Sequence, residues 1–217
     1  MKLIIFDCDS TLTAIEGIDE LARLQGEETF AEIERLTNAA MDGQVPINEI
    51  FGRRLDLIQP SAAFTDQVGQ LCLDEIEPTA QDTVKKLSTE GWLPVIVSGG
   101  FTQVIEPLAN ELGIKRIEAV PLKFNADGSY AGYDTSAAPT RNGGKPEVIA
   151  ALKKELNPEQ VVMVGDGISD LETRSEVDLF IGFTRYAARD KVVREAEVCV
   201  SSLKEILPLL GQTAVTS

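Results

Sequence analysis

Residues 2–13 of the chain read KLIIFDCDSTLT, and they predict how the rest of the molecule is organised. The stretch begins with four apolar residues, Leu3 to Phe6, a run typical of a strand buried on both faces of a sheet. Two carboxylates follow directly, Asp7 and Asp9, and their spacing puts both on the same side of an extended chain. Because ligands of open α/β sheets bind beyond the carboxyl ends of the strands, an acidic site is expected there.

The paired carboxylates indicate a metal site, although two simpler interpretations compete. Asp7 and Asp9 repel each other unless a cation lies between them, and Mg²⁺ prefers oxygen ligands. They could instead cap a turn, where aspartate is common. A calcium loop of the EF-hand type is excluded, because its glycine and glutamate positions hold Leu12 and Ile18. The choice between turn and metal site depends on what else in the chain converges on Asp7.

Length, charge and composition exclude several classes of protein. The chain has 217 residues, enough for one good-sized domain or a domain with a substantial insertion. Its net charge of −15 argues against a nucleic-acid partner, and no apolar run approaches the ~20 residues of a membrane span. The first apolar run is too short for a signal peptide, and three widely spaced cysteines make no disulfide framework. A cytoplasmic protein without a membrane partner is therefore expected.

The chain contains no histidine, which narrows the possible chemistry. Ser-His-Asp and Cys-His catalysis, zinc sites with histidine ligands and histidine acid–base chemistry are all excluded. Proton transfer has to rely on carboxylates, lysine, tyrosine, cysteine or water.

The distribution of apolar residues predicts an α/β fold: a doubly wound, mostly parallel, Rossmann-like sheet with an inserted helical cap. Residues 15–75 carry four apolar stripes at helical spacing and no strand signal, so they are expected to form the cap. The core is then made of residues 1–14 and 76–217. Within the second part, strands are expected over 93–97, 117–122, 161–164 and 179–182, helices over 79–90, 102–112, 145–156 and 187–195, a hairpin around 125–129, and a loose tail over 211–217.

Polar residues follow three of the expected strands at the same edge of the sheet. Asp166 and Asp170 follow the strand at 161–164 and add oxygen ligands to the first acidic pair. Ser98, Gly99 and Gly100 follow the strand at 93–97 and offer a hydroxyl group and backbone N–H groups to an anion.

Lys145, at the start of a predicted helix, adds a positive charge to this edge. It belongs to no P-loop, and Ser98 to no nucleophile elbow, because the flanking residues that each motif needs are missing. Carboxylates, hydroxyl, amides, lysine and a divalent metal together describe a site for a phosphoryl group. Without histidine or an activated serine, the expected nucleophile is a carboxylate that forms an acyl phosphate.

Four of these motifs, in this order, resemble those of the haloacid dehalogenase superfamily of phosphatases: DCDST at 7–11, Ser98, Lys145 and GDGISD at 165–170. Further stretches are similar to the members of this superfamily that hydrolyse O-phospho-L-serine. They are EGIDE at 16–20, AM at 40–41, VP at 45–46, RLDLIQP at 54–60, SGGF at 98–101 and YAGYD at 130–134, and this likeness covers nearly the whole chain.

The resemblance implies hydrolysis of this ester through an aspartyl phosphate. Asp7 is then the nucleophile, and Asp9 protonates the leaving serine oxygen and afterwards activates water. Mg²⁺ is expected on Asp7, the backbone carbonyl of Asp9, and Asp166, with Asp170 nearby through water or Lys145.

The resemblance also implies how the substrate is held. Ser98, Gly99, Gly100 and Lys145 are expected to hold the phosphate, with Ser98 and Lys145 counted among the catalytic residues. Contacts to the amino-acid part are expected from Glu16 to the ammonium, from Arg54 to the carboxylate, and from Met41.

Several features leave the substrate open. Arg53 lies beside Arg54, and Ile47, Ser169 and the segment 184–186 depart from the pattern of the relatives. One alternative keeps the mechanism but acts on another small phosphate monoester or transfers the phosphoryl group to an acceptor. Another is a receiver-like signalling domain, against which Asp9 argues because a second carboxylate shortens the life of an aspartyl phosphate. The expected partner is a small phosphate ester, and the expected state a monomer or homodimer.

Overall fold

The computed structural model describes residues 1–41 and 44–211, and its centre is a parallel sheet of six strands in the order β3-β2-β1-β6-β7-β8. The strands are β1 (Lys2–Phe6), β2 (Trp92–Phe101), β3 (Arg116–Val120), β6 (Gln160–Gly165), β7 (Leu179–Phe183) and β8 (Val198–Val200). The chain adds β2 and β3 on one side of β1, then crosses over and adds β6 to β8 on the other. The strand order therefore reverses between β1 and β6, which is where α/β sheets open a crevice for ligands.

Helices cover both faces of the sheet, as the apolar strands require. Along β1, Ile4 and Phe6 belong to one buried cluster, and Leu3 and Ile5 to another on the opposite face. The first face is covered by α5 (Ala80–Thr89), α6 (Thr102–Leu112) and α10 (Ile206–Gly211), and the second by α7 (Gly144–Leu156), α8 (Ile168–Leu171) and α9 (Asp190–Glu195). Within the described ranges, no helix has both the length and the apolar character to cross a membrane.

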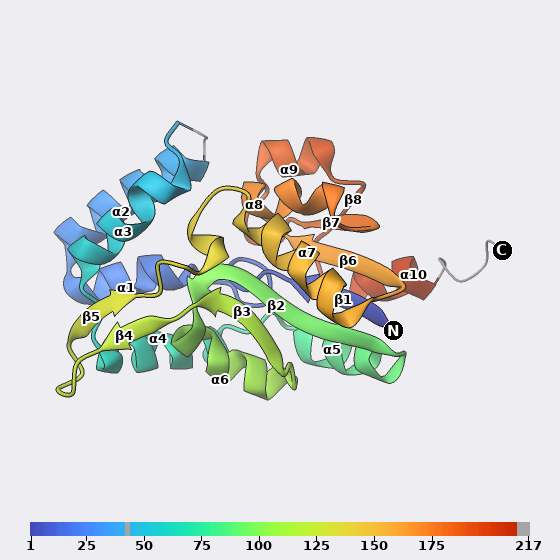
Figure 1. Ribbon diagram of the computed structural model, residues 1–217, viewed down its shortest axis with the longest axis horizontal. Helices are drawn as coiled ribbons and strands as arrows, with labels where there is room; N and C mark the ends of the chain where they lie inside the picture. The colour runs from blue at the N-terminus through green and yellow to red at the C-terminus, as the bar shows by residue number, and fades with distance from the viewer. Residues whose placement is uncertain (42–43, 212–217) are drawn as a thin grey trace.

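Four helices and a hairpin lie at one end of the molecule, away from the N-terminus (Figure 1). The helices are α1 (Gly17–Gln25), α2 (Glu27–Met41), α3 (Ile47–Ile58) and α4 (Ala62–Asp74), and the hairpin is β4 (Leu122–Phe124) with β5 (Tyr130–Tyr133). The hairpin supports the helices, because the Phe51 and Tyr133 rings lie 5.3 Å apart and Ala62 N donates to Gly128 O at 2.9 Å.

The predicted fold class is confirmed, and the differences are local. The second strand continues through Ser98, Gly99 and Gly100 to Phe101 instead of ending at residue 97. The strand expected over 117–122 is divided into β3 and β4 at Pro121, whose nitrogen carries no hydrogen for a ladder bond. The helix expected over 187–195 is α9, which begins at residue 190, and neither β8 nor α10 was predicted. Most of the expected tail, 212–217, falls outside the described residues.

The burial of the central strands predicts where stability resides. Val95 of β2 is completely buried, whereas Val193 of α9 is 48% exposed. Val95→Ala is expected to lower the free energy of unfolding by about 2 kcal/mol, because two buried carbons and their packing are lost. Val193→Ala, the matched control, should change it by less than about 0.5 kcal/mol. Denaturant unfolding measures both, and equal effects would contradict this account of the core.

Candidate active site

Asp7 lies at the first residue after β1, where the strand leaves the sheet. Its backbone N–H donates to Val164 O at 2.9 Å, so the pairing with β6 extends to the aspartate. Its Oδ1 accepts from Cys8 N at 2.7 Å and lies 2.9 Å from Lys145 Nζ. The carboxylate is therefore held in place by the edge of the sheet and by a fixed positive charge.

Lys145 is buried in the first turn of α7, with only 4% of its surface exposed. Its ammonium lies between two carboxylates, Asp7 and Asp170, and donates to Asp170 Oδ1 at 2.6 Å. Burial by itself would lower the pKa of Lys145, but the two carboxylates raise it above its ordinary value. The lysine therefore stays charged.

Asp170 is buried, and both of its oxygens have protein partners: Lys145 on one and Gly167 N, at 2.9 Å, on the other. Burial and the nearby Asp7 raise the pKa of Asp170 to about 7 against the opposing charge of Lys145. Gly165 permits this arrangement, because a Cβ there would collide with the Asp170 carboxylate.

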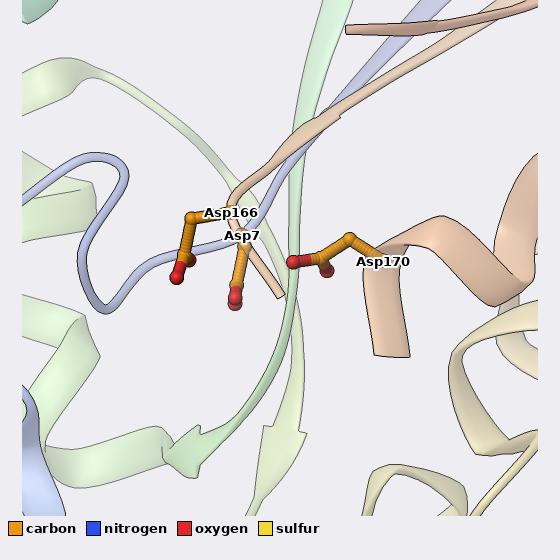
Figure 2. A group of neighbouring side chains, drawn as sticks. All are labelled: Asp7, Asp166 and Asp170. Carbon is orange, nitrogen blue, oxygen red and sulfur yellow. The ribbon is translucent and has the colours of Figure 1, made fainter. Parts of the chain in front are cut away.

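Three carboxylates, those of Asp7, Asp166 and Asp170, form a compact cluster. Figure 2 shows them converging, two from the ends of neighbouring strands and the third from α8, and one oxygen of each lies within 4.8 Å of the others. Burial, then Asp7 and Asp170, raises the pKa of Asp166 well above its ordinary value. An oxygen-only cluster with this repulsion suits a hard divalent cation, so the residues present fit a metal site.

Asp9 does not join this cluster with its side chain. Its Oδ2 accepts from Gly17 N at 3.1 Å, and its Oδ1 is buried without a hydrogen-bond partner. Burial, then Glu16 and Asp7, raises the pKa of Asp9 well above its ordinary value. Asp9 lines the same cavity as Asp7.

Ser98, Gly99 and Gly100 line the other side of this cavity. Ser98 is buried, and its Oγ accepts from Gly100 N at 3.0 Å. A Cβ at residue 100 would lie 3.4 Å from Asp9 Oδ2 and 3.3 Å from Ser98 Oγ, so only glycine leaves room for a ligand between these groups.

The cavity is small, about 80 Å³, and both the strand ends and the helices of residues 17–58 enclose it. This volume is well below the several hundred Å³ typical of drug-sized ligands, so it suits a small molecule. Its lining residues are Asp7, Asp9, Glu16, Ile18, Thr37, Ile47, Phe51, Arg54, Ser98, Gly99, Gly100, Phe101, Lys145 and Ser169.

Glu16 and Arg54 place opposite charges on the helical side of the cavity. Glu16 precedes α1, and its Oε1 accepts from Ser10 Oγ at 2.6 Å. Arg54 is 5% exposed and lines the cavity, whereas Arg53 is exposed and pairs with Glu32 at 3.2 Å. The side chain of Met41 lies outside the described residues.

The structure also brings in residues that sequence reasoning missed. Arg189 donates to Asp166 Oδ2 at 3.3 Å and lies 3.8 Å from Glu16, so it links the metal cluster to the helical side. Asn142 Oδ1 accepts from Ile47 N at 3.0 Å at the start of α3. Thr37 Oγ1 accepts from Arg54 Nη1 at 3.1 Å. None of these follows an apolar strand or belongs to a motif, so the sequence carried no signal for them.

Comparison with known proteins defines the class. The sequence-family model for haloacid dehalogenase-like hydrolases matches residues 1–178 of the chain. The chain belongs to this family of hydrolases, as the motifs predicted.

Individual relatives narrow the class further. Phosphoserine phosphatase of Bos taurus is 36% identical over 214 residues, 96% of this chain and 93% of its own. A phosphoserine phosphohydrolase-like protein from Francisella tularensis superimposes with a TM-score of 0.87 at 27% identity, over 97% of this chain and 100% of that one. A phosphoserine phosphatase solved as a phospho-aspartyl intermediate analogue gives 0.81 at 28% identity, over 96% and 98%. These likenesses confirm the resemblance to phosphoserine phosphatases.

The position of Lys145 between two carboxylates predicts its contribution to stability. Lys145→Met leaves Asp7 and Asp170 as an uncompensated buried pair, which is expected to lower the free energy of unfolding by about 3–5 kcal/mol. Lys154→Met, on the exposed side of the same helix, is the matched control and should have little effect. Denaturant unfolding in a metal chelator measures both. Similar losses in the two variants would contradict the role given to Lys145.

Proposed function

We propose that this protein hydrolyses O-phospho-L-serine to L-serine and phosphate, using Mg²⁺ and an aspartyl-phosphate intermediate on Asp7. The observation that carries the proposal is the position of Asp7. Its carboxylate lines a small cavity, 2.9 Å from a buried lysine and within the acidic cluster, and a buried arginine, Arg54, lines the same cavity.

The first step forms the intermediate. A carboxylate oxygen of Asp7 attacks phosphorus, the bond from phosphorus to the serine oxygen breaks, and that oxygen takes a proton from Asp9. Asp9 lines the same cavity as Asp7, and its Oδ1 has no hydrogen-bond partner among the described residues, which supports this role. A relative described as a phospho-aspartyl intermediate analogue supports the covalent route.

The second step releases phosphate. Asp9 accepts a proton from a water molecule, the water oxygen bonds to phosphorus, and the bond to Asp7 breaks. Both carboxylates return to their starting states, so atoms and protons balance over the cycle. The helices around the cavity exclude further water, which favours ordered delivery of one molecule.

The phosphoryl group is held by Lys145, the Ser98 hydroxyl and the backbone N–H of Gly99, while the N–H of Gly100 holds the Ser98 hydroxyl in place. These groups are fixed before the substrate enters: Lys145 by its two carboxylates and Ser98 by Gly100 N. Fixed donors stabilise the charge that develops on the phosphoryl oxygens at little cost in reorganisation.

Mg²⁺ would be held by Asp7, the backbone carbonyl of Asp9, and Asp166, with Asp170 nearby. When bound, it supplies positive charge that offsets the repulsion between Asp7 and the phosphate. The two oxygens of Asp170 already accept hydrogen bonds from Lys145 and Gly167 N. We therefore propose that Asp170 orients Lys145 and lies beside the metal.

The amino-acid part of the substrate is recognised by charge. Glu16 faces the ammonium group and Arg54 the carboxylate, and the small cavity rejects larger esters. Met41 stays a predicted contact.

The division into a core of residues 1–14 and 76–217 and a cap of residues 15–75 fits the enclosure of the cavity, and we propose it as the domain organisation. The cytoplasmic location and the monomeric or homodimeric state stay predictions from the sequence.

The substrate and nucleophile are tested together by phosphate release from a panel of monoesters. With Mg²⁺, the wild type is expected to prefer O-phospho-L-serine over O-phosphoethanolamine and glycerol phosphate. Asp7→Asn should lose activity by a factor on the order of 10³ or more, because the nucleophile is gone. Asp82→Asn, on the exposed start of α5, is the control and should keep it. Equal rates across the panel would contradict O-phospho-L-serine as the specific substrate but would still agree with a phosphate monoester hydrolase.

The metal site is tested by thermal unfolding with and without Mg²⁺. Binding at one hundred times the dissociation constant stabilises a protein by about 2.7 kcal/mol, so the unfolding midpoint of the wild type should rise measurably. Asp166→Asn should abolish the rise, because it removes a carboxylate of the cluster. Asp82→Asn should retain it. If Mg²⁺ raised the unfolding midpoint of Asp166→Asn as much as that of the wild type, the metal would have to bind at another site.

A further inference from the structure

Arg54 is a buried cation with few hydrogen-bond or ion-pair partners in the protein. Its guanidinium donates from Nη1 to the neutral hydroxyl of Thr37, and its Nε has no hydrogen-bond partner among the described residues. Asp19 and Glu16 raise its pKa, but over residues 1–41 and 44–211 neither forms an ion pair with it, and Glu16 lies instead 3.8 Å from Arg189. Burial outweighs them and lowers the pKa of Arg54 to about 10, so the side chain still carries its charge at neutral pH.

To bind a carboxylate, the guanidinium of Arg54 needs a fixed orientation as well as its charge. It can bind a carboxylate with two parallel hydrogen bonds only if its plane faces the ligand. A long side chain loses rotamer freedom when it is ordered, so a group that orders it beforehand improves affinity. Phe51 lies on one side, with its ring centre 5.7 Å from the guanidinium carbon, but a ring contact does not fix rotation within the plane.

Thr37 supplies the directional contact. It lies on α2, is 8% exposed, and lines the same cavity as Arg54 of α3. Threonine is branched at Cβ and has few side-chain rotamers, so its hydroxyl direction is well defined. The 3.1 Å bond to Nη1 therefore orients one edge of the guanidinium and leaves Nε, the unpartnered donor, for a ligand.

We propose that Thr37 is a positioning residue that, through Arg54, sets the preference of this site for phosphate esters that carry a carboxylate. The inference rests on the proposed function, because it concerns the same cavity. A purely structural role, in which the bond only ties α2 to α3, would affect every ester alike. The proposal requires an effect confined to esters with a carboxylate.

The test compares two substrates in Thr37→Val, which keeps the shape of the side chain and removes the hydroxyl. For O-phospho-L-serine, kcat/KM is expected to fall about tenfold, mostly through KM, because a hydrogen bond to a charged group is lost. For O-phosphoethanolamine, which has no carboxylate, kcat/KM should stay at the wild-type value. Thr37→Ser retains the hydroxyl and should recover most of the preference.

Three controls make the outcome decisive. Thr29→Val changes another threonine of α2, one that does not line the cavity, and should leave the ratio between the substrates unchanged. In an Arg54→Lys background, Thr37→Val should have little further effect on O-phospho-L-serine, because both changes act through one group. Thermal unfolding of each variant identifies any loss of folded protein.

Two results would overturn the inference, and they differ in what they reject. If the wild type prefers O-phospho-L-serine but Thr37→Val slows both substrates equally, or neither, then Thr37 does not position Arg54 and the proposed function stands. If the wild type shows no preference for the ester with a carboxylate, the proposed function falls and the inference falls with it.

Discussion

The arrangement of the site depends on one electrostatic constraint: three carboxylates lie within 4.8 Å of one another at the edge of a parallel sheet, beside a single buried lysine. Such a cluster is costly unless positive charge balances it. Lys145 supplies one charge, and a divalent cation suits the remainder. The geometry follows from the topology, because Asp7 and Asp166 end adjacent strands at the point where the strand order reverses. The pairing of β1 with β6 therefore places Asp7, the proposed nucleophile, beside Asp166, and Lys145 of α7 lies between Asp7 and Asp170.

The helices that follow β1 add further lining to the cavity at this edge of the sheet. In a chain with a net charge of −15, a buried arginine is a scarce cation, and Arg54 of α3 lines the same cavity as Asp7 and Asp9. Glu16 and Arg54 thus offer opposite charges, while the strand ends offer groups that suit a phosphate. A ligand that satisfies all of them carries a phosphate, an ammonium and a carboxylate. Phosphoserine is such a ligand, and the 36% identical bovine relative is a phosphoserine phosphatase.

Local signals in the sequence predicted the strand ends, and packing between distant elements produced the rest. The apolar runs located β1 and β6 and with them Asp7 and Asp166, because each run is directly followed by its polar residue. The resemblance selected Arg54 over Arg53, and the burial of the two side chains agrees. Thr37, Asn142 and Arg189 were missed, since their partners come from other helices and loops. The extension of β2 through two glycines was missed because glycine usually signals the end of a strand.

The central claim is that Asp7 carries the phosphoryl group during turnover, and mass spectrometry of acid-quenched enzyme tests it most directly. The wild type is mixed with excess O-phospho-L-serine and Mg²⁺, quenched during the steady state, digested and mapped. The account predicts a phosphoryl group on the peptide that contains Asp7, which disappears once the substrate is consumed. A phosphoryl group on Ser98, none on any peptide during rapid turnover, or a modification of Asp7 that persists after the substrate is exhausted would contradict it.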